Sequence, residues 1–167
     1  MTSLALIQLL LSSYRQLLGH DLVPATDSLI DAAAWLQHEA PFCVLAHDAS
    51  DDPRFIFAND SAHRCFDYPD GQLLGLPSRL SAATPDQQER EQLLSAVREH
   101  GYACGYRGLR IAKTGRRFWI EDVTVWNLID ELGVRHGQAA TYRRWRDAPD
   151  SAPTSVATLS QSQDSPQ

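Results

Sequence analysis

Apolar residues near the N-terminus recur at helical intervals. From Leu4 to Leu18 they return every three or four positions, and Gly19 then provides a stop signal. A second helical pattern follows, with Thr26 or Asp27 as its N-cap, and ends before Pro41. The pattern predicts two amphipathic helices at the start of the chain.

The hydrophobic period then changes to that of strands. Residues 42–48 and 54–59 are rich in aromatic and aliphatic side chains, and the polar residues 49–53 separate them. This arrangement predicts a β-hairpin. Asn59 and the two residues after it can cap a short helix that ends at Phe66.

Turn signals and one long helix occupy the middle of the chain. A Pro-Asp-Gly turn at residues 69–71 leads into a short helical turn that ends at Gly75. A long helix then opens at Thr84 or Asp86 and stops at Gly101.

The remaining segments favour strands. Residues 102–112, 116–128 and 134–144 are separated by short turn-like sequences and predict a three-stranded meander. Together with the hairpin they indicate an α+β fold: a five-stranded antiparallel sheet with the inserted helices on one face and the two N-terminal helices on the other. Residues 147–167 are rich in Ser, Pro, Gln and Thr and predict a disordered tail.

Composition narrows the class of protein. The chain has 167 residues, 43% of them hydrophobic, which fits one domain with a sizeable core. A net charge of −6 argues against binding to nucleic acid or an anionic membrane. Three cysteines without a CxxC pair predict neither zinc nor disulfides, and a reducing cytoplasm fits best. The N-terminal apolar run lacks a basic n-region and is too short to span a bilayer.

An acidic pair lies in the centre of the strand GRRFWIEDVTVWN. Because side chains alternate along a strand, the even-numbered positions share one face: Phe118, Ile120, Asp122, Thr124 and Trp126. If that face lines the interior, the Asp122 carboxylate needs a partner, because burying it unpaired costs several kcal/mol. Candidate partners are Arg79, Arg110 and Gln138. Such a pair would either fix strand register or present polar groups to a ligand; exposure of Asp122 is the third alternative.

Several strings of this sequence resemble a known family. The order of elements, FAND, FDYPDGQLLGLPSRL, and the final GRRFWIEDVTVWNLID with GVRHGQAATYRRW are similar to a PAS domain. More narrowly, residues 35–145 resemble the free-standing bacterial form of the PAS-like MEKHLA domain, which also occurs at the C-terminus of plant class-three homeodomain-leucine-zipper transcription factors. The letters MEKHLA themselves do not occur in the chain.

The resemblance implies a cavity between the sheet and the helices that holds a small ligand, or a fold that relays a signal through a helical extension. The domain organisation is then N-terminal helices over 1–40, a PAS-like domain over 41–146 and the tail. The candidate cavity residues are Asn59, Phe66, Tyr68, Arg79, Leu93, Val97, Arg110, Phe118, Ile120, Asp122, Thr124, Trp126 and Gln138.

No cofactor is expected. In the light-sensing LOV branch of the PAS family a cysteine forms the flavin adduct, and Ser78 stands at that place here. Gln138 is similar to a flavin-contacting glutamine of that branch, which alone is weak support. His100, at the end of the long helix, suits helix capping better than haem ligation. No metal-ligand spacing is present at the remaining histidines considered, His47, His63 and His136.

The predicted function is a cytoplasmic sensory or interaction module without an output domain of its own, acting on a small molecule or a regulatory protein. No catalytic motif is present, and adjacent Glu121 and Asp122 face opposite ways. A small enzyme using the cavity and a purely structural dimerisation module are the alternatives. The apolar N-terminal helix predicts a homodimer, with packing against the chain's own sheet as the other interpretation. The arginines around Trp145 indicate a protected edge strand rather than a nucleic-acid site.

Overall fold

The N-terminal part of the chain is helical. The computed structural model describes residues 3–69, 71–83 and 87–149. Helix α1 spans Ser3–Leu18, and α2 (Leu29–Ala34) continues directly into the π-helix η1 (Trp35–Glu39). Both predicted helices are confirmed. Gly19 ends the first of them in the left-handed conformation, with φ of 81°.

The cap of the second helix differs from the prediction. The N-cap is Ser28, whose Oγ accepts a hydrogen bond from the backbone amide of Asp31 at 3.1 Å. Thr26 Oγ1 instead donates to the carbonyl oxygen of Ser28 at 2.9 Å, so it stabilises the turn before the helix. The choice of Thr26 or Asp27 as the cap was therefore wrong by one or two residues.

The predicted hairpin and short helix are both present. Strands β1 (Cys43–Asp48) and β2 (Phe55–Ala58) pair antiparallel. Helix α3 (Asp60–Cys65) follows, and the Asn59 side chain caps it by accepting from the amide of Ala62. Residues 43–65 thus form a compact strand-strand-helix unit.

Two further helical segments pack against the sheet at β3. A 3₁₀-helix η2 spans Ser78–Ser81, and α4 spans Gln87–His100 before Gly101 ends it with φ of 82°. The predicted N-cap at Thr84 or Asp86 and the central residue of the turn at 69–71 lie outside the described residues.

The last strands complete one antiparallel sheet. They are β3 (Tyr102–Ile111), β4 (Arg117–Ile129), β5 (Arg135–Tyr142) and β6 (Arg144–Asp147). The order is β2-β1-β5-β4-β3, and β6 pairs with the first part of β4. The sheet therefore has six strands rather than five, because the last predicted strand breaks at Arg143 and its end continues along β4.

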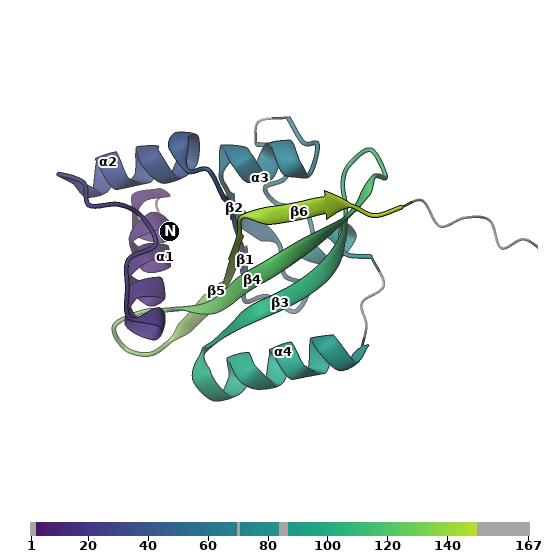
Figure 1. Cartoon of the computed structure of the whole chain (residues 1–167). Coiled ribbons are helices and arrows are strands. Elements are labelled where there is room, and N and C mark those ends of the chain that lie inside the picture. Colours follow the sequence, from purple (N-terminus) through teal and green to yellow (C-terminus); the bar gives the residue numbers. More distant parts are fainter. Residues whose placement is uncertain (1–2, 70, 84–86, 150–167) are drawn as a thin grey trace, which may run out of the picture.

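Helices cover both faces of the sheet: α1 and α2 lie together on one side, and α4 lies along β3 on the other (Figure 1). The outer face packs against α1 and η1 through Leu10, Leu36, Trp126 and Leu128. The inner face packs against α3, η2 and α4. In the described part of the chain, no helix has the length and apolar character needed to cross a membrane.

A bulge at Asp122 changes which residues of β4 face inward. Asp122 has a φ of 52°, so the strict alternation of side chains stops there. Phe118 and Ile120 lie in the inner cluster before the bulge, whereas the inner residues after it are the odd-numbered Val123 and Val125. The predicted single even-numbered face was wrong, because one irregular residue shifts the phase by one.

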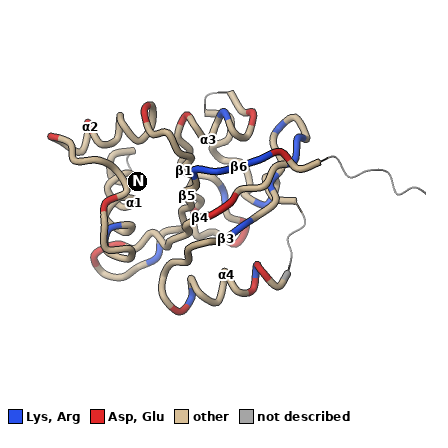
Figure 2. Tube along the Cα trace, in the orientation of Figure 1, with Lys and Arg blue, Asp and Glu red and all other residues tan. Residues whose placement is uncertain are grey.

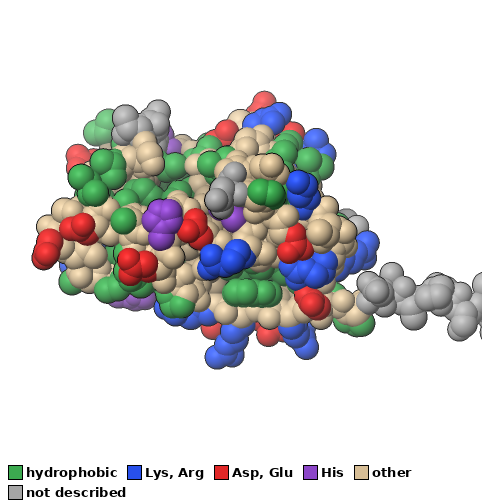
Figure 3. All heavy atoms as spheres, turned by 90° about the horizontal axis from the view of Figure 1, so that it is seen from above, with side chains coloured by type: hydrophobic (Ala, Val, Ile, Leu, Met, Phe, Trp, Pro, Cys, Tyr) green, Lys and Arg blue, Asp and Glu red, His purple; other side chains and the backbone are tan. Residues whose placement is uncertain are grey.

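Charged residues of both signs lie along β6 and the neighbouring strand β4, as the coloured trace in Figure 2 shows. Arg146 Nε lies 2.6 Å from Glu121 Oε1, and Arg116 Nη1 lies 2.6 Å from Asp147 Oδ1. The space-filling view of the upper side of the molecule also shows the two signs intermixed among hydrophobic side chains (Figure 3). The Arg146–Glu121 and Arg116–Asp147 ion pairs connect β6 to β4 and to the residue before β4.

Candidate functional site

A cavity of about 800 Å³ lies between the inner face of the sheet and the segments η2 and α4. Its apolar wall comes from the sheet and from the residue after α3: Leu45, Phe66, Ile120, Val125, Ala140 and Tyr142. Leu93 and Leu94 approach from α4. A volume of this size accommodates a small organic molecule.

Strand register divides the sheet wall of this cavity into rows. Leu45 on β1 and Val125 on β4 both lie directly across from Ala140 on β5. Two residues further along each strand, His47 and Asn127 both lie across from Gln138. We call His47, Gln138 and Asn127 the polar row; His47 and Gln138 line the cavity, and Asn127 accepts a hydrogen bond from Arg135. The inner face thus offers an apolar surface that ends in a line of hydrogen-bonding groups.

His47 is held in one orientation within the polar row. Its Nδ1 lies 2.8 Å from the carbonyl oxygen of Asp48, and because a carbonyl only accepts, Nδ1 carries the hydrogen. Burial lowers the pKa of His47, opposed by its hydrogen bonds to Asp48 and Gln138, and the positive charge of Arg135 lowers it further. The ring is therefore neutral at pH 7, with Nε2 as an acceptor.

Four arginines and two aspartates line the same cavity: Arg79, Arg90, Arg110, Arg135, Asp51 and Asp52. Arg79 Nε forms an exposed ion pair with Asp52 at 3.1 Å. Arg135 Nε donates to the neutral amide oxygen of Asn127 at 3.1 Å. The described wall carries an excess of two positive charges in a protein whose net charge is −6.

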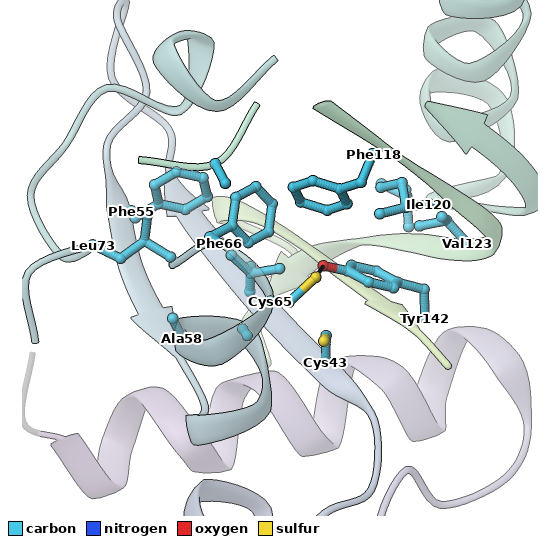
Figure 4. Close-up of a cluster of buried hydrophobic side chains, with 14 of the residues drawn as sticks. Cys43, Phe55, Ala58, Cys65, Phe66, Leu73, Phe118, Ile120, Val123 and Tyr142 are labelled. Atoms are coloured by element: carbon cyan, nitrogen blue, oxygen red, sulfur yellow. Dashed lines mark hydrogen bonds between the residues drawn. The ribbon is translucent and has the colours of Figure 1, made fainter. Parts of the chain in front are cut away.

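One end of the inner face is closed by an aromatic and sulfur cluster (Figure 4). Tyr142 Oη donates to Cys65 Sγ at 3.5 Å, and Cys43 lies directly across from Tyr142 on β1. Hydrogen bonding with Cys65 and burial raise the pKa of the Cys43 thiol, and burial raises the pKa of Tyr142. Cys43 and Tyr142 therefore stay protonated and pack in the core.

Six of the residues proposed from the sequence line the cavity: Phe66, Arg79, Leu93, Arg110, Ile120 and Gln138. They come from α3's C-terminal end, η2, α4 and three different strands, so the fold does bring them together.

Three proposed residues lie elsewhere. Asp122 is exposed on the bulge, and Arg79, its suggested partner, pairs with Asp52 instead. Thr124 and Trp126 point to the outer face, where Thr124 Oγ1 donates to Cys104 Sγ at 3.8 Å and Trp126 Nε1 donates to the Leu10 carbonyl at 3.3 Å. The cause is the phase shift at Asp122: Phe118 and Ile120 before it keep the predicted inner face, whereas Thr124 and Trp126 after it turn to the outer face.

The other four proposed residues are structural. Val97 and Phe118 are buried in the inner core, and Tyr68 packs against it beneath Lys113, whose Nζ lies 5.9 Å from the ring centre. Asn59 is fully buried and makes four side-chain hydrogen bonds to backbone groups of Leu36, Phe42, Val44 and Ala62. It joins η1, β1 and α3.

His47 and Arg135 were not identified as cavity residues from the sequence, although both line the cavity. The signal for His47 was present, because alternation in FCVLAHD places it on the same face as Cys43 and Leu45. Arg135 begins a strand after a turn, where no local pattern distinguishes a cavity residue from an exposed one. Asp51 and Asp52 belong to a hairpin loop that only the fold brings against η2.

The chemistry of the wall bears on flavin and metal binding. Ser78 and Gln138 both line the cavity, but no cysteine does: Cys43 and Cys65 are buried beneath Tyr142, and Cys104 is exposed beside Thr124. The chain therefore offers a bound flavin no thiol for an adduct. Within residues 3–69, 71–83 and 87–149, no three His, Cys, Asp or Glu side chains gather as a metal site. His100 lies at the exposed end of α4, 3.8 Å from Glu99.

Comparison with known proteins identifies the family and the fold. The sequence model of the MEKHLA domain matches residues 4–147. A PAS domain of a protein from Colwellia psychrerythraea superposes with a TM-score of 0.56 at 19% identity, covering 72% of this chain and 96% of that one. The match begins within α1, so the N-terminal helices belong to the matched region. No curated protein matches the sequence.

Two solved LOV proteins are also similar. An RNA-binding light-oxygen-voltage receptor has a TM-score of 0.58 at 21% identity, covering 77% of this chain and 37% of its own. The light-state dimer of the fungal blue-light photoreceptor Vivid has a TM-score of 0.51 at 15% identity, covering 73% and 81%. At these identities the likeness shows a common fold and no more.

Proposed function

Because the chain belongs to the MEKHLA domain family and has a PAS-like fold, we propose that it is a sensory or interaction module that binds a small ligand between its sheet and η2 and α4. The observation that carries this proposal is the cavity of about 800 Å³, whose apolar sheet surface ends in the polar row. A few polar groups in a mostly apolar wall are typical of ligand sites.

Strand β4 can transmit a structural change from the cavity to the other face of the sheet. Val125 lines the cavity, while the next residue, Trp126, is fully buried against α1 and donates a hydrogen bond to the Leu10 carbonyl. A ligand that displaces Val125 therefore moves the residue on which α1 rests. In this proposal the contact between α1 and β4 is the element whose position reports ligand occupancy.

The full chain, purified under native conditions, tests the proposal. Native mass spectrometry is expected to show a non-covalently bound small molecule that is released on denaturation. Ala140→Leu adds a side chain in the middle of the cavity wall, and we expect it to abolish the bound mass while the protein stays folded. Ala49→Leu makes the same change in an exposed loop and should retain the ligand.

Two results would contradict this function. Chemical conversion of the released molecule by the protein would favour the alternative, a small enzyme that uses the cavity. A cavity that accepts no molecule from the cell or from a compound library would favour a structural module.

A partner protein is the second part of this proposal. The buried face of α1, including Ile7, Leu10 and Tyr14, packs against the chain's own sheet. A homodimer would therefore use other surfaces of the N-terminal helices, where Leu4 and Ile30 are exposed. Light scattering on the purified chain measures its mass, and a monomer at all concentrations would contradict the predicted homodimer.

A further inference from the structure

The charge of the cavity is opposite to that of the protein. The whole chain carries −6, yet the described cavity wall contains four arginines against two aspartates. Cavities lined by one sign of charge raise the local concentration of ligands of the other sign. The wall thus discriminates against cations, despite the acidity of the molecule as a whole.

Arg135 is the cation best placed to contact a ligand on the sheet. Among the described residues, its Nε donates to the neutral amide oxygen of Asn127, and its terminal NH₂ groups remain as donors. It lies across from Ile129, two residue pairs beyond the polar row, and close enough for its charge to lower the pKa of His47. Arg79, by contrast, is already compensated by Asp52.

The groups near Arg135 are suited to a ligand with a negatively charged hydrogen-bond acceptor. Gln138 adds an amide donor directly across from His47. The neighbouring row of Leu45, Ala140 and Val125 continues the surface as a purely apolar strip. A molecule lying on the sheet therefore meets hydrocarbon along its length and hydrogen-bond donors with a positive charge at one end.

We propose, building on the function above, that the cavity selects small organic carboxylates, with the carboxylate at Arg135 and Gln138 and an apolar body over Leu45, Ala140 and Val125. The guanidinium fork matches the planar carboxylate and forms charge-assisted hydrogen bonds with it. A neutral or cationic analogue with the same body loses those bonds and leaves the arginine uncompensated.

Three probes that share one apolar body test the charge preference: octanoate, 1-octanol and octylammonium. Titration calorimetry on the full chain is expected to give a dissociation constant for octanoate at least roughly tenfold below that for octanol, with octylammonium weakest. Octyl phosphate is included, and tighter binding of it than of octanoate would overturn the choice of a carboxylate.

Variants test the placement of the carboxylate. Arg135→Gln should weaken octanoate roughly tenfold and leave octanol within about twofold, whereas Arg135→Lys should recover part of the loss. The control Arg117→Gln removes an exposed charge that does not line the cavity and should leave octanoate within about twofold, and Arg110→Gln removes a lining charge on the edge strand β3. A loss in Arg110→Gln and none in Arg135→Gln would overturn the placement.

A second readout comes from His47 itself. The charged groups around it are Asp48 and Arg135, with Asp51, Asp52 and Arg79 also on the cavity wall. A bound carboxylate at the polar row adds a negative charge, so octanoate should raise the His47 pKa in an NMR titration, and octanol should not. No change with saturating octanoate would overturn the proposal.

The outcomes separate this inference from the proposed function. Equal binding of all three probes would overturn carboxylate selection but leave a ligand-binding cavity. Failure of every probe, together with purified protein that carries no small molecule, would count against the proposed function itself.

Discussion

Ser13 and Ile129 exchange two hydrogen bonds across 116 residues of sequence. Ser13 Oγ donates to the Ile129 carbonyl oxygen at 3.0 Å and accepts from its backbone amide at 2.8 Å. Ser13 is fully buried, so these bonds fasten the middle of α1 to the end of β4 without competition from water. We expect Ser13→Ala to lower the free energy of unfolding by about 1–3 kcal/mol, measured by urea denaturation, because two backbone groups lose their partner.

The neighbouring serine is the matched control. Ser12 is exposed and its hydroxyl donates only to the Leu9 carbonyl within the helix. Ser12→Ala should change stability by less than about 0.5 kcal/mol. Equal effects of the two substitutions would show that the α1–β4 contact does not depend on this hydroxyl.

Replacement of Asn59 is expected to destabilise the fold more than replacement of Ser13. Its Oδ1 accepts from Val44 and Ala62, and its Nδ2 donates to Leu36 and Phe42, all inside the core. Asn59→Ala should cost about 3–5 kcal/mol in unfolding free energy, because four buried backbone groups lose a partner.

A carboxylate cannot replace this amide. Asn59→Asp keeps the shape but places one acceptor oxygen where the Nδ2 donor was, against the Leu36 and Phe42 carbonyl oxygens, so it should be as destabilising at pH 7 as the alanine variant. Wild-type stability of Asn59→Asp in the same urea series would contradict the assigned hydrogen bonds.

The backbone at Asp122 favours glycine over a branched residue. With φ of 52°, Asp122→Gly should alter unfolding free energy by less than about 1 kcal/mol, whereas Asp122→Val should lower it by about 1–2 kcal/mol. A buried and paired carboxylate, as one reading of the sequence suggested, predicts instead a loss of several kcal/mol for the glycine variant. Thermal and urea unfolding of both variants distinguish the two cases.

His47 should make stability depend on pH in a defined direction. Burial lowers its pKa in the folded state, so the unfolded chain binds a proton first as the pH falls. Its contribution to stability is full above the unfolded pKa of about 6.5 and decreases as the pH drops from there towards the folded pKa.

Replacement of this histidine removes that dependence. His47→Gln should flatten the decrease in unfolding free energy below about pH 6.5, measured by urea denaturation at closely spaced pH values. An unchanged slope in His47→Gln would mean that another group causes the decrease.

The sequence by itself determined the elements and their order. Helical spacing in residues 4–18, alternation in 42–48 and the stop signals at Gly19 and Gly101 all reflect local backbone preferences, which operate over a few residues. These features, together with the MEKHLA strings, were sufficient to predict a PAS-like antiparallel sheet with helices on both faces.

Only the tertiary structure decided which side chains meet. One left-handed residue, Asp122, shifts the phase of β4, and a break at Arg143 converts one predicted strand into β5 and β6. The polar row depends on how β1 and β4 pair with β5, a register set by turns and packing rather than by any one strand. Contacts between residues about ninety positions apart, such as His47 and Gln138, therefore require the folded chain.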